Sequence, residues 1–315
     1  MQASVKLSEM LGIEHSLLVA PMFLVSNTAM VIAALKAGAT AAIPALNYRT
    51  DQEFRKALTE IRQATDKAFG VNLIVNSSNP YYMRQLSTAC AMKVDFVITS
   101  LGNPVKVIER CKPLGIRVFC DVVNLEHAKK VEALGADALI AVGSEAGGHC
   151  GPVSNTYLLP ELIKHCDIPV IAAGGVGTAA QYRQYIDQGA AGVSAGTIFI
   201  ATEESPVSKE YKQALINYGA KDIVLSTKLS GMPLTVINTP YVQKIGTRAN
   251  RLEQFLQRNK RLRRYIKMMV YGRGMKKLEK AAFSASYQSV WVAGPAVEHI
   301  HSIRAVGQIV NELTG

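Results

Sequence analysis

Residues 127–142, HAKKVEALGADALIAV, contain the unit that decides the fold of this chain. Their first half places apolar residues on one face of a helix, and a short apolar strand follows a single glycine. Gly135 lies where the helix must end, in the left-handed conformation that glycine adopts at least cost. The stretch therefore predicts a joint from a helix to a buried strand, as in parallel α/β folds.

The same unit recurs along the chain with a glycine at the same place, namely Gly38, Gly115 or Gly189. The copies are VIAALKAGATAAIPA (31–45), QYRQYIDQGAAGVSAG (181–196) and a looser VIERCKPLGIRVFCDV (107–122). Four further apolar stretches supply the remaining strands: LLVAPM (17–22), FGVNLIV (69–75), DFVITS (95–100) and IPVIAAGG (168–175). The sequence thus contains eight strand candidates, and four of them directly follow a predicted helix.

Helix-length gaps of about 20 to 30 residues separate these eight strands, as βα units require. Eight such strands predict an α/β protein with a (β/α)₈ TIM barrel. A chain of 315 residues suits one such domain with a local insertion. A doubly wound open sheet is the alternative, because periodicity alone does not distinguish eight barrel strands from eight open ones.

The pattern changes after the eighth strand. Residues 203–290 contain no further helix-to-strand joint, and RLEQFLQRNKRLRRYIKMM (251–269) carries one apolar helical stripe. We therefore expect a helical, basic insertion at 203–290 in a barrel built from residues 1–202 and 291–315. Its amphipathic helix would suit a contact in a homodimer. Apolar residues at the end of the chain predict a terminal helix that completes the outer ring: Val297, Ile300, Ile303, Val306, Ile309, Val310 and Leu313.

The composition limits the classes of function. No apolar run reaches the roughly 18 residues that span a bilayer, so we expect a cytoplasmic protein without a membrane segment. Five cysteines without CxxC spacing do not indicate a disulfide frame or a zinc cluster. The net charge of +11 is concentrated in residues 244–280, where no nucleic-acid-binding motif occurs. This segment therefore favours a solvated helical face or a dock for an acidic partner over nucleic acid.

Two glycine-rich stretches follow the seventh and eighth strands, at the strand ends where TIM barrels place their working residues. They are AAGGVG (172–177) and AGT (195–197). Their backbone N–H groups can approach an anion closely, a helix start adds a positive dipole end, and Thr197 adds a hydroxyl. Two ordinary glycine turns would look the same, but their position after these two strands predicts a phosphate cradle.

The loop after the sixth strand, GSEAGGHCG (143–151), contains a candidate catalytic residue. Its glycines would bring backbone amides near a bound ring, and His149 has an ordinary pKa close to neutrality, which suits the transfer of one proton. The alternatives are an ordinary loop histidine or a metal site shared with nearby cysteines. No ligand spacing supports a metal, so proton transfer is the preferred role.

Other strand ends carry weaker signals. In APMFLVSN (20–27), Met22 could pack on a flat ring, although methionine is more often core filler. Asn72 interrupts an apolar strand, and a buried amide needs hydrogen-bond partners from a ligand or from the core. Ser100 and Asp121 end neighbouring strands, and their roles are open.

In this order and spacing, APM, GVNL, GSEAGGH, AAGGVG and GVSAGTIF resemble the nitronate monooxygenase family, and WVAGPAVEHI (291–300) resembles the closing segment of that family. The resemblance implies an FMN-binding TIM barrel in which His149 is the catalytic acid or base. It assigns the ring to Met22 and Asn72, and the phosphate to Gly174, Gly175, Gly196 and Thr197. Gly147 and Gly148 of the histidine loop are the further cofactor-binding candidates. No metal is implied.

The implied reaction oxidises an alkyl nitronate with O₂ to a carbonyl compound and nitrite. Related enoyl-acyl-carrier-protein reductases and quinone reductases share these motifs. The alternative is therefore an FMN reductase that uses NAD(P)H, with an acidic carrier protein docked at 244–280. A barrel without redox chemistry is a third reading. The Pro21–Met22 pair resembles the monooxygenases, whereas Val142 stands where several subgroups carry an acid and Pro295 where glutamine is common.

Overall fold

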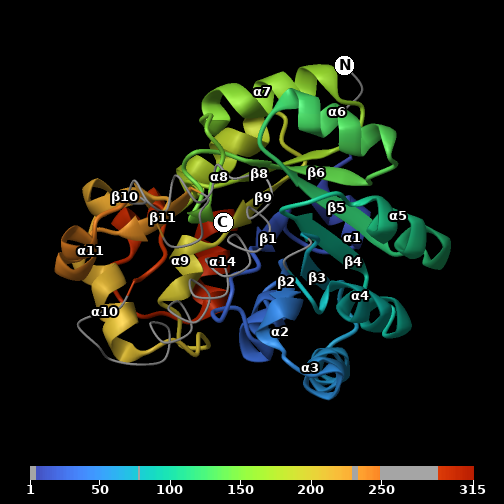
Figure 1. Ribbon diagram of the computed structural model, residues 1–315, viewed down its shortest axis with the longest axis horizontal. Coiled ribbons are helices and arrows are strands. Elements are labelled where there is room, and N and C mark those ends of the chain that lie inside the picture. Colours follow the sequence, from blue (N-terminus) through green and yellow to red (C-terminus); the bar gives the residue numbers. More distant parts are fainter. Residues whose placement is uncertain (1–4, 77–78, 229–232, 249–289) are drawn as a thin grey trace, which may run out of the picture.

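The computed structural model describes residues 5–76, 79–228, 233–248 and 290–315 (Figure 1). Eight parallel strands form a closed barrel, because the last of them pairs back with the first. In barrel order they are β1 (Leu17–Val19), β2 (Thr40–Pro44), β3 (Gly70–Ile74), β4 (Phe96–Ser100), β5 (Arg117–Val122), β6 (Ala138–Val142), β8 (Val170–Ala173) and β9 (Gly192–Ala195). The predicted TIM barrel is confirmed, and the open-sheet alternative is wrong.

Helices follow the strands and surround the barrel (Figure 1). The outer ring consists of α2 (Thr28–Lys36), α3 (Asp51–Ala64), α4 (Tyr82–Ala91), α5 (Val105–Cys111), α6 (Leu125–Ala133), α7 (Asn155–His165), α8 (Ala179–Asp187) and α14 (Val306–Thr314). Short 3₁₀ turns lie at η1 (Ala45–Asn47) and η2 (Lys112–Leu114). The four glycines of the repeated unit, Gly38, Gly115, Gly135 and Gly189, all have positive φ, between +71° and +93°. This confirms that they end their helices as the sequence predicts.

Bulky side chains fill the interior of the barrel beneath the C-terminal strand ends. The rings of Phe96 and Phe119 stack with their centroids 4.9 Å apart. A Cβ on Gly70 would lie 2.1 Å from the Phe96 ring, so β3 needs glycine there. Helix α1 (Leu7–Leu11) adds Leu7 to the same cluster. The packed interior closes the barrel here, and TIM barrels place their binding sites at the C-terminal ends of the strands.

The insertion after β9 contains a small sheet as well as helices. Its described helices are α9 (Thr197–Ile200), α10 (Lys209–Asn217), η3 (Ala220–Asp222) and α11 (Pro240–Ile245). Strands β10 (Ile223–Ser226) and β11 (Leu234–Ile237) form an antiparallel hairpin, and β7 (Gly148–His149) pairs with β11. The insertion, which the sequence predicts as helical, thus contains a small sheet beside its helices. The predicted stripe at 251–269 and most of the basic segment lie outside the described residues.

The terminal helix is shorter than predicted. Residues Pro295–His299 form a 3₁₀ turn, η4, and α14 begins only at Val306. The reason is that the closing segment first pairs with the insertion, through a bridge between Val236 and Val292 and a bond from the Ile237 N–H to the Trp291 carbonyl. Ile303 is accordingly 42% exposed. Among the described residues, no helix has the length and apolar character needed to cross a membrane.

Candidate active site

A cavity of about 470 Å³ lies at the C-terminal ends of the barrel strands, and the hairpin and the closing segment form part of its wall. All nine residues that the sequence singles out line this one cavity: Met22, Asn72, Gly147, Gly148, His149, Gly174, Gly175, Gly196 and Thr197. Apolar side chains from the loops after β1, β2 and β4, such as Leu24, Leu46 and Leu101, line much of the remainder. The cavity can therefore hold a largely apolar ligand.

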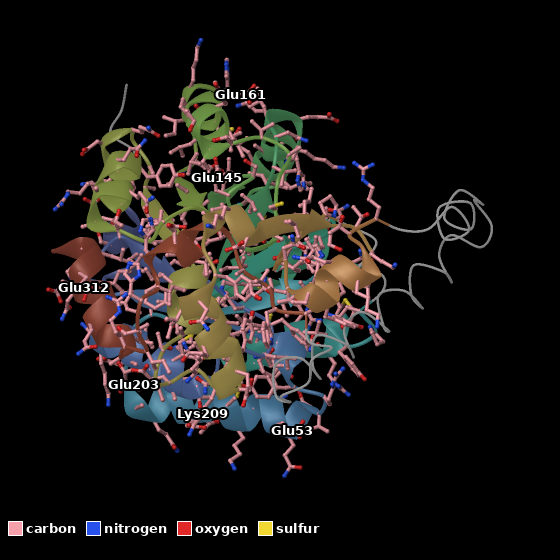
Figure 2. All side chains as sticks on the ribbon, turned by 90° about the vertical axis from the view of Figure 1, so that its left-hand side faces the viewer. Glu53, Glu145, Glu161, Glu203, Lys209 and Glu312 are labelled. Carbon is pink, nitrogen blue, oxygen red and sulfur yellow. The ribbon has the colours of Figure 1, made fainter. Side chains whose placement is uncertain are left out.

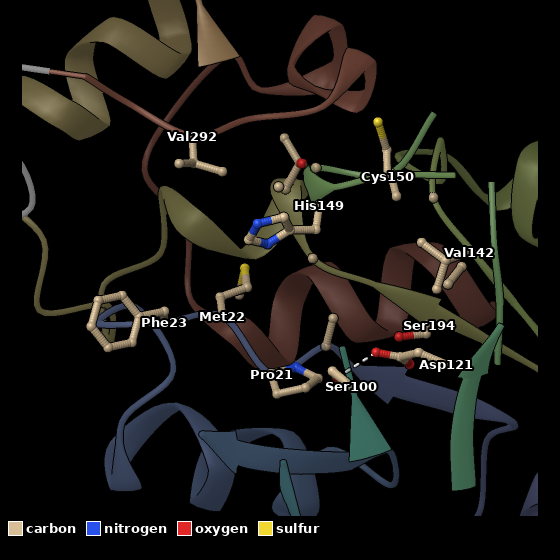
Figure 3. A pocket seen from close by; sticks show the side chains of 18 of the residues that line it. Pro21, Met22, Phe23, Ser100, Asp121, Val142, His149, Cys150, Ser194 and Val292 are labelled. Carbon is tan, nitrogen blue, oxygen red and sulfur yellow. Dashed lines mark hydrogen bonds between the residues drawn. The ribbon is translucent and has the colours of Figure 1, made fainter. Parts of the chain in front are cut away.

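His149 projects from β7 into the cavity, and its imidazole lies above Met22 (Figure 3). The side chain is half-buried, and this burial lowers the pKa of His149 below its ordinary value. The neutral imidazole is therefore the form present at neutral pH, with one ring nitrogen able to accept a proton.

The insertion holds the histidine loop in place. Leu234 pairs with His149, and the Gly148 N–H donates to Thr235 Oγ1 at 2.9 Å. Thr235 Oγ1 in turn donates to the Ala146 carbonyl at 3.1 Å. Sequence reasoning missed Thr235, and the available signal was the short apolar alternation of LTVI (234–237).

The glycine loops after β6, β8 and β9 pack against one another. A Cβ on Gly174 would lie 2.6 Å from the Ala146 nitrogen, and one on Gly147 would lie 2.6 Å from Thr197 Oγ1. Thr197 Oγ1 also accepts the Gly294 N–H at 2.9 Å. Glycine at 147 and 174 thus permits close contact between loops.

Three backbone N–H groups at the cavity wall are open to a ligand. Those of Gly175, Val176 and Thr197 have no acceptor among the described residues. Gly175 adopts φ +78°, and Thr197 is the first residue of α9. N–H groups without a protein acceptor, close to a helix start, form a suitable environment for an anion.

A network behind these loops fixes their relative positions. The side chain of Glu145 is half-buried, whereas Glu53 and Glu161 lie exposed on the surface (Figure 2). The Glu145 carboxylate accepts hydrogen bonds from the Ser154 hydroxyl and the Asn155 N–H. Asn155 Nδ2 also donates to the Ala173 carbonyl at 2.8 Å, so that α7 connects the loop after β6 to the end of β8.

The opposite wall of the cavity carries a polar chain that crosses three strands. Asn72 Nδ2 donates to Ser100 Oγ at 2.7 Å, and the Ser100 hydroxyl donates to Asp121 Oδ2. Burial raises the pKa of Asp121 to about 6, although the hydrogen bond from Ser100 lowers it. The structure thus places a carboxyl group in the same cavity as His149.

A closed barrel with a histidine and glycine loops around one cavity at the strand ends defines a TIM-barrel enzyme. The nitronate monooxygenase family model matches residues 75–315, and the chain belongs to this family. Its members are oxidoreductases, and the family is one of flavin enzymes. Within the described parts of the chain, no three His, Cys, Asp or Glu side chains are grouped so that they could hold a metal ion.

The chain is similar to several known proteins. It is 34% identical to a Rhodococcus jostii (3aS,4S,5R,7aS)-5-hydroxy-7a-methyl-1-oxo-octahydro-1H-indene-4-carboxyl-CoA dehydrogenase, over 78% of this chain and 68% of the relative. A nitronate monooxygenase from Paraburkholderia phytofirmans is 29% identical, over 70% of this chain and 73% of that protein. FabK from Thermotoga maritima superposes with a TM-score of 0.84 at 30% identity, with 97% of this chain and 93% of FabK covered.

Proposed function

We propose that this protein is an FMN-dependent nitronate monooxygenase that oxidises alkyl nitronates with O₂ to carbonyl compounds and nitrite. The observation that carries the proposal is the position of His149. Its imidazole projects into the cavity beside Met22, and burial favours its neutral form. Membership of the nitronate monooxygenase family supports the same reaction.

The residues at the cavity wall fit FMN. The open N–H groups of Gly175, Val176 and Thr197 would bind the phosphate, with the glycine at 175 leaving room for its approach. Met22 and Asn72 would contact the ring from the barrel side. When bound, FMN would supply the electron acceptor of the reaction. Gly147 and Gly174 would shape this site indirectly, through the loop contacts that they permit.

Residues of the protein would accept the substrate proton and exclude water from the cavity. Neutral His149 would accept the α-proton of a nitroalkane, or donate a hydrogen bond to a nitronate oxygen through its other ring nitrogen. The apolar walls would exclude water and strengthen this hydrogen bond. A small anionic substrate would thereby be held between the histidine and the ring site.

A second candidate is an FMN-dependent oxidoreductase that acts on an acyl thioester or a quinone, with NAD(P)H as reductant where the substrate is reduced. The observation in its favour is that the coenzyme A-ester dehydrogenases of Rhodococcus jostii and Mycobacterium tuberculosis are 34% and 33% identical to this chain. An acidic carrier protein would approach the basic segment 244–280, most of which lies outside the described residues.

Anaerobic absorbance spectra of the purified protein distinguish the two candidates. Propyl-2-nitronate, NADH, NADPH and an acyl-CoA ester are added in separate cuvettes. Bleaching of the flavin band by the nitronate alone is the expected result, with release of nitrite once air is admitted. Bleaching by a reduced nicotinamide or by the thioester, and none by the nitronate, would overturn the monooxygenase proposal.

A further inference from the structure

Asp121 is a cavity residue that the proposed function does not use. It belongs to β5 and lines the cavity, and Figure 3 shows its carboxyl group with the hydrogen bond from Ser100. Ser100 supplies its hydrogen bond, and no Lys, Arg or His among the described residues forms an ion pair with it. A desolvated carboxylate without a cation is unfavourable unless a further donor completes its hydrogen bonding.

The bond from Asn72 fixes the direction of the polar chain. Ser100 accepts the Asn72 amide proton and has one hydroxyl proton of its own, which it gives to Asp121 Oδ2. The chain therefore orients the carboxyl group and leaves Oδ1 for another donor. The neighbouring cavity residues Ile98, Ile140 and Val142 offer no side-chain donor, and the Ser194 hydroxyl, which also lines the cavity, forms no hydrogen bond with Asp121. A donor for Oδ1 would therefore come from a ligand or from water.

We propose that Asp121 is a further cofactor-binding residue, whose Oδ1 accepts a hydrogen bond from an N–H group of the heterocycle in the cavity, with Ser100 and Asn72 as positioning residues. This inference rests on the proposed function, because the heterocycle is then the ring of FMN. The oxidised flavin ring carries a single N–H, the imide at N3. Asp121 in its ionised form is the matching acceptor for that group.

The test measures the dissociation constants of FMN and of 3-methyl-FMN, which lacks the imide proton, by flavin fluorescence quenching on the apoprotein. The wild-type protein should bind FMN about 10- to 100-fold more tightly than 3-methyl-FMN, as for a hydrogen bond to a charged group. Asp121→Asn should lose most of this preference, because its amide would present a donor to the imide N–H. Asp187→Asn, an exposed change of the same type on α8, should keep the preference.

The pH dependence gives a second readout. The preference for FMN should weaken below pH 6 in the wild-type protein, where Asp121 becomes protonated, and should be independent of pH in Asp121→Asn. Comparison of the two flavins at each pH cancels the titration of their common phosphate group. Ser100→Ala should reduce the preference partially, because the carboxyl group loses its orientation. Circular dichroism of each apoprotein verifies that it is folded.

The possible failures are distinguishable. If Asp121→Asn binds FMN with an unchanged preference over 3-methyl-FMN, the inference about Asp121 is wrong and the proposed function stands. If the folded wild-type protein binds neither flavin, both proposals are wrong. If it binds FMN with the expected preference yet does not oxidise nitronates, the role of Asp121 stands and the proposed reaction fails.

Discussion

Asp121 should destabilise the apoprotein above pH 6, and Asp121→Asn should remove this cost. Burial raises the pKa of the carboxyl group from an ordinary 3.8 to about 6 in the folded chain. A carboxyl group that is harder to ionise when folded favours unfolding as the pH rises through this window. At 1.36 kcal/mol for each pKa unit, the full cost is about 3 kcal/mol above pH 7. It falls to about half of this at pH 5.

Urea unfolding of the apoprotein, followed by circular dichroism, measures this cost. Asp121→Asn should raise the free energy of unfolding by about 3 kcal/mol at pH 8 and by about half as much at pH 5. The substituted amide keeps the carbonyl that accepts the Ser100 proton, so the packing should be preserved. Asp187→Asn controls for the loss of one negative charge. An equal effect at both pH values, or a loss of stability at pH 8, would refute the reasoning.

Four further predictions concern the cofactor and turnover. His149→Ala should retain FMN and lose about 10² to 10⁴ in turnover, as for a positioned acid or base; unchanged turnover would exclude a catalytic role. The wild-type rate should fall only below pH 6.5, because the lowered pKa of His149 keeps the imidazole neutral down to that range. Gly175→Val should be purified without flavin absorbance, since φ is +78° and a Cβ would lie 3.1 Å from that of Glu145. Thr235→Val should lower kcat and leave FMN affinity unchanged, because the Gly148 N–H loses its acceptor; a weaker FMN affinity with a normal kcat would contradict this.

The barrel could be predicted because its determinants are local. Each of the four helix-to-strand joints has a glycine and two apolar periods within one window, such as residues 127–142, and these joints together with four further strand candidates suggest closure. The hairpin could not be predicted in this way. Strand β11 has four residues, and it is stabilised by pairing with His149, which lies far away in the sequence. A four-residue strand leaves a weak local signal when one of its two partners is distant in the sequence, even though the other, β10, is close.

The candidate site likewise has a part that the sequence predicts and a part that it does not. Each predicted residue follows a strand or lies on one, so that the barrel geometry brings Asn72 and the loop of His149 to the same end of the barrel. The polar chain depends on the stagger of the strands. Asn72 is in register with Ile98 rather than with Ser100, and the hydroxyl comes into reach because it lies two residues further along β4. The register between β3 and β4 is a property of the closed barrel, and it could not be predicted from the sequence.

The site therefore has two walls of different origin. Asn72, Ser100 and Asp121 stand on barrel strands, and their positions follow from the closed sheet. His149 stands on β7, and its position depends on β11 of the insertion. Because one wall faces the proposed cofactor and the other holds the proposed base, changes in the barrel strands should act on flavin affinity, whereas changes in the hairpin should act on turnover. A chain that altered its insertion could thus change its substrate and still bind the same cofactor.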